Sequence, residues 1–221
     1  YAAQEQLVGG VETLFKTSSD TVVGYANDAY KTAGMSANEY METVTSFSAS
    51  LLASMNNDTA AAAEKANVAI TDMSDNANKM GTDISLIQNA YNGFAKQNYT
   101  MLDNLKLGYG GTQEEMQRLL DDASKLSGIK YDISSYSDVV DAIHVVQTEM
   151  GITGTTAKEA STTIEGSVSS MSSAWDNWVA GMADSEANFS QLTSNLVDSI
   201  VTVVGNIAPR VIETVPRLVS G

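Results

Sequence analysis

Apolar residues recur at intervals of three and four along nearly the whole chain, and this periodicity restricts it to a helical fold. Between Ser36 and Met55 one helical face collects Tyr40, Val44, Phe47, Leu51 and Met55. An α-helix has 3.6 residues per turn, so such a stripe is typical of an amphipathic helix. The pattern continues to about Ile207 without a strand or hairpin signal. The sequence therefore predicts an all-α protein.

Capping residues and glycines mark the ends of the expected helices. Three pairs have the spacing of a capping box: Ser36 with Glu39, Thr112 with Glu115, and Thr156 with Glu159. Ser137 is expected to cap a further helix. Glycines such as Gly81 and Gly128 follow periodic segments, where a left-handed residue commonly ends a helix. We expect eight to ten helices, joined by short glycine-containing turns and packed as an irregular bundle.

The helix expected at Thr59–Met80 carries a heptad seam. Its members alternate at spacings of three and four: Ala63, Ala66, Ile70, Met73, Ala77 and Met80. Small side chains let two helices approach closely but bury little area, so the seam alone would make a weak coiled coil. Packing inside a bundle is the favoured interpretation, and a trimeric coiled coil is the alternative.

Three glycines lie within four residues at Gly108, Gly110 and Gly111, around Tyr109. Such a run destabilises a helix and predicts a turn or a hinge between helices. It lacks the Lys-Ser/Thr ending of a phosphate-binding loop and follows no strand. We therefore expect a candidate hinge here, with no role in binding nucleotide.

The charge balance and the absence of cysteine exclude several classes of function. The 221 residues include 27 Asp and Glu against 12 Lys and Arg, which gives a formal net charge of −15. An acidic surface repels phosphate backbones, so no nucleic-acid specificity is expected. There is no cysteine, which excludes disulfides, thiolate zinc sites and cysteine nucleophiles.

No set of residues predicts catalysis or metal binding. His144 is the single histidine, and with Asp141 one helical turn away it is expected at the surface or at a boundary. Three acidic pairs occur at close spacing: Asp72 with Asp75, Asp121 with Asp122, and Asp138 with Asp141. None fits a calcium loop, so solvated helix faces are the favoured interpretation. We expect a protein that is not an enzyme and holds no cofactor.

The region from Ser167 onwards ends in two apolar helices. The first carries Val168, Met171, Trp175, Trp178 and Met182, and its tryptophans are expected to anchor a core. The second is a candidate membrane-active segment containing Leu192, Leu196, Ile200, Val203 and Val204. Its uncharged stretch is too short to span a bilayer. A packed core helix is the default, and an interfacial segment acting on the host envelope is the alternative. We expect residues 1–187 to form the bundle and residues 188–221 an apolar helix and tail.

Three runs of the sequence resemble the tail tape measure proteins of long-tailed bacteriophages. The run from Ile87 to Leu120 includes NYTMLDNLKLGYGGTQEEMQRLL, the run Tyr131–Val179 includes YSDVVDAIHVVQTEMGITGTTAKEA, and the run Met35–Leu52 begins MSANEYMETV. Together they cover most of the chain. Because family members are usually much longer, we expect the chain to be one helical module of such a protein.

The resemblance implies a structural role. Proteins of this family lie in the lumen of the tail tube, set tail length during assembly in the host cytoplasm, and assist genome delivery. It implies self-association as a trimer or higher, with the tail tube protein and tail assembly chaperones as partners and the host membrane as a possible contact. It supplies no catalytic residues.

Overall fold

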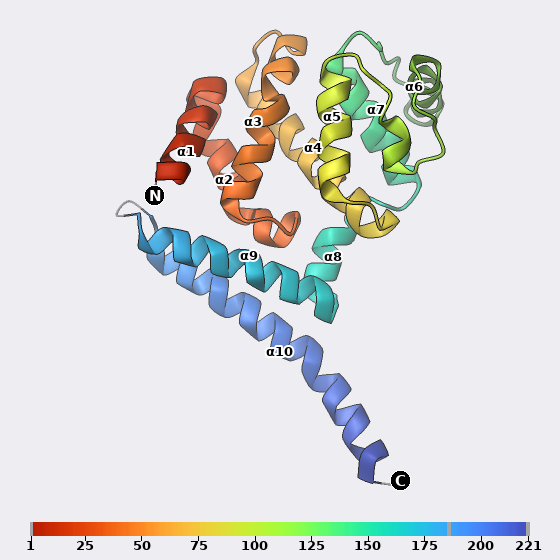
Figure 1. Ribbon diagram of the computed structural model, residues 1–221. Helices are drawn as coiled ribbons and strands as arrows, with labels where there is room; N and C mark the ends of the chain where they lie inside the picture. The colour runs from red at the N-terminus through yellow and green to blue at the C-terminus, as the bar shows by residue number, and fades with distance from the viewer. Residues whose placement is uncertain (1, 185–186, 220–221) are drawn as a thin grey trace.

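The computed structural model describes residues 2–184 and 187–219, and this part of the chain is helical with no strand (Figure 1). Side chains are described for 2–163, 165–184 and 187–209. The α-helices are α1 Ala2–Phe15, α2 Ser19–Thr32, α3 Ala37–Ser54, α4 Thr59–Met80, α5 Ile84–Ala95, α6 Gln113–Ser127, α7 Tyr136–Glu149, α8 Thr155–Thr162, α9 Ile164–Met182 and α10 Phe189–Val219. Two 3₁₀ helices are η1 Lys16–Ser18 and η2 Leu102–Leu105. The predicted all-α fold of about eight to ten helices is confirmed.

Several predicted helix boundaries are confirmed by their capping geometry. At the start of α3, the Ser36 amide donates to Glu39 Oε2 at 2.8 Å, and the Glu39 amide donates to Ser36 Oγ at 3.3 Å. This reciprocal pair satisfies two amides that the first helical turn leaves free. Helices α4 and α6 end at Gly81 and Gly128, whose φ angles of +66° and +74° suit glycine.

Two other predicted caps are wrong in detail. Thr112 Oγ1 does accept from the Glu115 amide, at 3.2 Å. However, the Glu115 carboxylate accepts from the Gly110 amide at 3.1 Å instead of completing a capping box. Helix α7 is capped by Ser135, not by Ser137. The polar run before α7 offers several serines, and the sequence alone does not rank them.

Helices α1 to α7 surround one apolar core. Its largest buried side chains are Tyr40, Tyr91, Phe15, Phe94, Met41, Leu51, Ile70, Met73, Ile87, Leu102, Leu105 and Met116. Helix α4 runs through the middle and contacts α1, α2, α3, α5, α7 and α8. Burial of this apolar surface is the main force that stabilises the bundle.

Helices α9 and α10 form an antiparallel hairpin beneath the bundle, and α8 joins it to α7 (Figure 1). We call this hairpin the arm. It shares a small separate cluster with the bundle, formed by Tyr30, Ala174 and Leu196. The boundary predicted between residues 187 and 188 therefore falls inside the hairpin, and the change in packing comes before α9.

The orientation of α9 contradicts the prediction that its tryptophan stripe lies in a core. Val168 is 41% exposed, Trp175 53% and Met182 58%. The face turned inward is small and polar, with Ser167, Ser170, Ser173, Ala174 and Asn177 buried. The prediction is therefore wrong for the exposed members of the stripe, whereas Met171 and Trp178 are half-buried and pack against the small cluster that the arm shares with the bundle.

Polar contacts at the α2–α3 turn explain this orientation. The Ala37 amide donates to Asn177 Oδ1 at 2.7 Å, and Ser173 Oγ donates to the Gly34 carbonyl at 3.3 Å. Backbone groups at such a turn need hydrogen-bond partners when they are covered. Serine and asparagine supply them, whereas tryptophan and valine would leave them unpaired.

Candidate functional site

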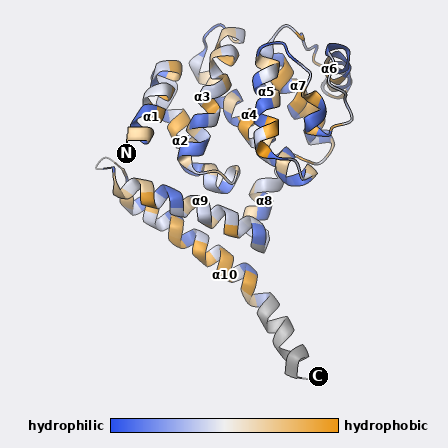
Figure 2. Ribbon diagram, viewed as in Figure 1, coloured by the Kyte–Doolittle hydropathy of each residue, from blue (hydrophilic) through white to orange (hydrophobic). Residues whose placement is uncertain are grey.

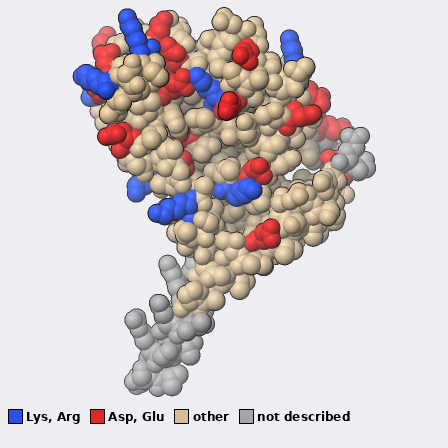
Figure 3. Space-filling model, turned by 180° about the vertical axis from the view of Figure 1, so that it is seen from behind, with Lys and Arg blue, Asp and Glu red and all other residues tan. Residues whose placement is uncertain are grey.

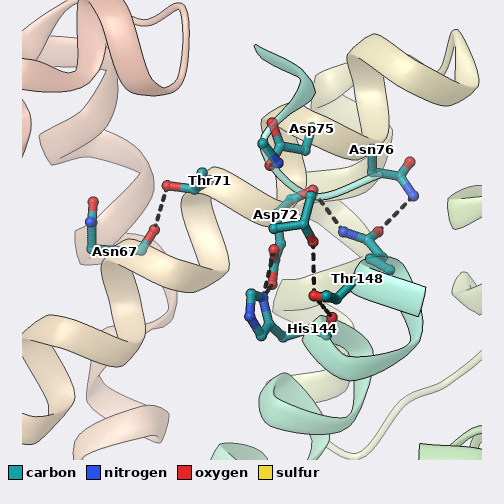
Figure 4. A network of polar contacts seen from close by, with 10 residues as sticks. Asn67, Thr71, Asp72, Asp75, Asn76, His144 and Thr148 are labelled. Atoms are coloured by element: carbon teal, nitrogen blue, oxygen red, sulfur yellow. Dashed lines mark hydrogen bonds and ion pairs between the residues drawn. The ribbon is translucent and has the colours of Figure 1, made fainter. Parts of the chain in front are cut away.

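A buried polar network joins α4, α7 and α8 at the centre of the bundle (Figure 4). Helix α4 contributes Asp72, Asp75 and Asn76, whose exposed fractions are 1%, 0% and 0%. Helix α7 contributes His144 and Gln147. The prediction that Asp72 and Asp75 lie on a solvated face is therefore wrong, and both carboxylates have partners inside the protein.

Asp72 pairs with the single histidine. His144 Nδ1 lies 3.0 Å from Asp72 Oδ1 and 2.9 Å from Asp72 Oδ2. Burial raises the pKa of Asp72 to about 6, although the hydrogen bond and charge of His144 oppose that rise. The hydrogen bond to Asp72 raises the pKa of His144. Its side chain is 38% exposed, in agreement with the predicted boundary position.

Asp75 holds the first turn of α8. Its Oδ2 accepts from the Gly154 amide at 2.8 Å, and its Oδ1 accepts from the Thr156 amide at 2.9 Å. A carboxylate at a helix N-terminus also interacts favourably with the helix dipole. The predicted capping box of Thr156 with Glu159 is therefore wrong, because the first turn of α8 is held by a carboxylate 79 and 81 residues away from the two amides that donate to it.

Asn76 and Gln147 complete the network. Asn76 Nδ2 donates to the Leu105 carbonyl at 2.8 Å and to Gln147 Oε1 at 2.9 Å. Gln147 Nε2 donates to the Asp72 carbonyl at 3.1 Å, and Thr82 Oγ1 donates to Asn76 Oδ1 at 2.9 Å. The sequence did show that Asp72, Asp75 and Asn76 lie next to the apolar seam of α4. It could not reveal the distant partners, which are 29 to 81 residues away.

The network links three helices and so has a structural role, and we call the network the tie. The hydroxyl nearest to His144 in the chain, Thr148 Oγ1, donates to the His144 backbone carbonyl at 2.8 Å and not to the ring. Within the described residues no group of three or more His, Asp or Glu side chains could hold a metal ion. The arrangement fixes α7 and α8 to α4.

The predicted seam of α4 packs within the chain. Ala63, Ala66, Ile70 and Met73 are completely buried, while Ala77 and Met80 are half-buried. Since these side chains contact the other helices of the bundle, a trimer through this seam would require the bundle to open. The structure therefore supports packing inside the bundle, the interpretation that the sequence favoured.

The candidate hinge is a structured loop between η2 and α6. Gly108 has a φ of +91°, and a Cβ on Gly111 would meet the Thr100 carbonyl oxygen at 2.2 Å. The first position requires left-handed backbone, and the second requires a close approach of two chain segments. These two constraints account for Gly108 and Gly111 without any motion of the loop, and neither applies to Gly110.

Side chains of α6 brace the same loop. Arg118 donates to the Gly108 carbonyl at 2.7 Å and lies 4.3 Å from the centre of the Tyr109 ring. The Tyr109 hydroxyl donates to Asp122 at 2.6 Å. The ion pair with Arg118, at 2.6 Å, lowers the pKa of Glu115 to about 2. A hinge here stays a prediction, and its opening would break these contacts.

Ten of the fourteen exposed large apolar side chains of the described residues lie on the arm, where Figure 2 shows apolar and polar residues mixed along α9 and α10. We call the surface that these ten side chains form the outer face. Its exposed members are Val168, Trp175, Val179 and Met182 on α9, and Phe189, Val197, Ile200, Val201, Val204 and Ile207 on α10. Trp178 lies between Trp175 and Phe189, with ring centres at 5.5 Å and 5.4 Å. Charged side chains cover the bundle but are few on the arm (Figure 3).

The candidate membrane-active segment is divided between the two sides of α10. Leu196 and Val203 are 8% exposed and face the hairpin, and Leu192 is half-buried. Ile200 and Val204 are 43% and 59% exposed and belong to the outer face. Among the described residues, no helix combines the length and the apolar character that crossing a bilayer requires.

Comparison with known proteins identifies no relative: no family model, no curated protein and no solved structure matches the chain. The resemblance of three sequence runs to tape measure proteins therefore stays a hypothesis.

Proposed function

We propose that the chain is a structural module of a bacteriophage tail tape measure protein and that copies associate through the outer face of the arm. The observation that carries the assembly role is the outward orientation of the apolar residues on α9 and α10. Soluble proteins rarely leave a contiguous apolar surface of this kind without a partner. The sequence resemblance supports the identity of the assembly.

The dimensions of the outer face suit a helical partner. Nineteen residues of α9 give a length of about 28 Å, and two packed helices give a width of about 20 Å. The resulting footprint of about 560 Å² per copy, or about 1,120 Å² for two copies together, is at the low end of specific interfaces. Trp175 and Trp178 provide the kind of side chain that dominates binding energy in such contacts.

The distribution of charge favours a second copy of the chain as the partner that covers the outer face. Residues 159–209, which include every exposed member of the outer face, contain no Lys or Arg, so the outer face lacks the cations that draw an amphipathic helix to an anionic membrane. Arg210 and Arg217 follow it in the sequence of α10. The protein as a whole carries a formal charge of −15, so two copies repel each other most weakly where charges are few. The outer face is that region, and apolar contact does not need opposite charge.

In this proposal the module works during tail assembly in the host cytoplasm and remains in the lumen of the tail tube. Self-association keeps several tape measure chains in register, while the tail tube protein and assembly chaperones bind elsewhere along the parent protein. The module then leaves with the genome at infection. The tie formed by Asp72, Asp75 and His144 maintains the bundle in this scheme and has no catalytic part.

Substitution within the parent protein, followed by electron microscopy of the tails, tests the proposal. Val201→Asp places a charge on the outer face, where Val201 is 63% exposed. We expect loss of normal tails and of infectivity. Ile129→Asp is a matched control, since Ile129 is 58% exposed on the bundle. Normal tails from Val201→Asp, or equal defects from both variants, would contradict the proposal.

The exposed apolar residues of α10 also support a second candidate, a membrane-active module. A liposome-leakage assay with the intact protein and with Ile200→Asp separates the two functions. Leakage by the unaltered protein that Ile200→Asp abolishes would favour the membrane function. The assembly proposal predicts no leakage from either protein.

A further inference from the structure

The contact between the arm and the bundle is small and largely polar. Its apolar part is the cluster of Tyr30, Ala174 and Leu196, against which the half-buried side chains of Met171 and Trp178 pack. The other residues that α9 turns inward are serines and an asparagine. Because apolar burial is roughly proportional to area, this cluster stabilises the docked arm much less than the main core stabilises the bundle.

Two open grooves flank that cluster. The first, of about 460 Å³, lies between α2 and α8 on one side and α9 and α10 on the other. The second, of about 300 Å³, lies between the arm and the segments that contain Gln4, Asn27 and Ser36. Well-packed protein interiors contain few gaps larger than a water molecule. The arm therefore lies against the bundle without the close packing that would hold it in place.

The hydrogen bonds that dock the arm can be exchanged for bonds to water. Asn177 Oδ1 accepts from the Ala37 amide, and Ser173 Oγ donates to the Gly34 carbonyl. Departure of the arm would expose all four groups to solvent, where water can replace each partner. Such an exchange leaves only a small net stability for each hydrogen bond. These two bonds therefore orient the docked arm and oppose its departure only weakly.

The chain connection between the arm and α8 is a single extended residue. Thr163, with φ −109° and ψ 154°, lies between the end of α8 and the start of α9. Asp75 holds α8 to the bundle. Asn206 Nδ2 donates to the Thr163 carbonyl at 3.1 Å, which places α10 beside the same point. Because a few residues at the end of an element can absorb a rotation between rigid parts, Thr163 is suited to be a pivot.

We propose that the arm undocks from the bundle as an intact hairpin that turns about Thr163. Undocking separates Ala174 and Leu196 from Tyr30 and leaves the contacts between α9 and α10 in place. The outer face then changes its direction relative to the bundle, so modules that associate through it are not held in one fixed orientation. This motion goes beyond the proposed assembly function and does not depend on it, because it concerns the inward face of the arm.

Thiol labelling of the intact protein under native conditions tests the motion, because the chain has no cysteine of its own. Ala174→Cys places a thiol in the contact between arm and bundle, and Ala66→Cys places one in the main core. The two alanines are 1% and 0% exposed. We expect Ala174→Cys to be labelled about 100-fold faster than Ala66→Cys, because local opening needs less free energy than global unfolding. Adding Asn177→Ala should speed the labelling of Ala174→Cys about fivefold.

The dependence on urea separates undocking from global unfolding. Labelling of Ala174→Cys should change little with urea, because undocking exposes little surface, whereas labelling of Ala66→Cys should rise steeply. Circular dichroism melts establish that each variant folds. Equal labelling rates with the same dependence on urea would overturn the proposal.

A third thiol tests whether the hairpin stays intact. Val203 is 8% exposed and faces α9 inside the arm. Val203→Cys should be labelled more slowly than Ala174→Cys, because undocking leaves the contact between α9 and α10 closed. Labelling of Val203→Cys as fast as that of Ala174→Cys would mean that the arm melts, and would contradict its movement as one unit.

Discussion

The bundle and the arm use amphipathic helices in opposite ways. In α4 the apolar positions Ile70 and Met73 are completely buried, and the chain itself covers them. In α9 the apolar positions Trp175 and Met182 are 53% and 58% exposed, and serines and Asn177 face the bundle. The difference teaches that a periodic apolar stripe locates a binding face but does not say whether the same chain covers it.

The largest expected difference between the two regions concerns stability. Ile70→Ala should lower the free energy of unfolding by about 2–5 kcal/mol, because it leaves a cavity in a fully packed core. Ile200→Ala on the outer face should cost less than about 1 kcal/mol, since Ile200 is already 43% exposed. Urea unfolding followed by circular dichroism measures both. Similar costs would show that the arm is as tightly packed as the bundle.

The second prediction concerns the connection between the regions. Asp75→Asn should lower the free energy of unfolding by about 2–3 kcal/mol, because an amide cannot accept from both the Gly154 and Thr156 amides as the carboxylate does. Asp58→Asn is the control, since Asp58 is an exposed cap of α4 and asparagine caps equally well. Equal, small effects in thermal melts would mean that Asp75 does not hold α8.

A third prediction follows from the raised pKa values of Asp72 and His144. A group whose pKa is higher in the folded protein contributes stability below its unfolded pKa and loses it as pH rises through the folded pKa. For Asp72 that loss falls between about pH 4 and pH 6, and for His144 it falls above pH 6.5. Both shifts therefore predict greater stability of the bundle as pH falls from 8 to 5.

Asp72→Asn removes the carboxylate that raises the pKa of His144. Relative to this variant, the unaltered protein should gain stability as the pH falls from 8 to 5. The other ionisable groups near the pair are Asp75, Asp141 and Lys65, which pairs with Asp141 at 2.6 Å, and all three are retained in both proteins. Parallel curves of unfolding free energy against pH would rule out the coupling.

The smallest expected effect tests the polar contact between arm and bundle. Asn177→Ala removes the acceptor for the Ala37 amide and should cost about 1 kcal/mol. Hydrogen exchange should show faster exchange of α9 amides, with those of α4 unchanged. Equal acceleration in both helices would mean that arm and bundle open together.

Much of the fold could be predicted from the sequence, because it depends on interactions between residues that are close in the chain. The capping box at Ser36 and Glu39 and the glycine ends of α4 and α6 depend on residues a few positions apart, so their spacing was sufficient. The range Thr59–Met80 was predicted with the same ends that α4 has. Periodicity likewise placed Ile70 and Met73 on the buried face.

Two errors were local, at the caps of α6 and α7, and the larger ones involve partners distant in the sequence. Asp72 was expected in solvent because its partner His144 lies 72 residues away. Thr156 was expected to begin a capping box, but Asp75 accepts from the Gly154 and Thr156 amides across the fold instead. Trp175 was expected in a core because its spacing is apolar, whereas the contacts of Asn177 decide the orientation of α9. Spacing determines the faces of a helix, and tertiary hydrogen bonds determine which face turns inward.

Sedimentation equilibrium of the intact protein over a range of concentrations tests most directly whether the outer face is an assembly surface. The account predicts reversible association that strengthens with salt, because screening weakens repulsion between acidic copies. Val201→Asp should abolish this association, and Ile129→Asp should preserve it. A monomer at every concentration, or an equal loss in both variants, would contradict the central claim.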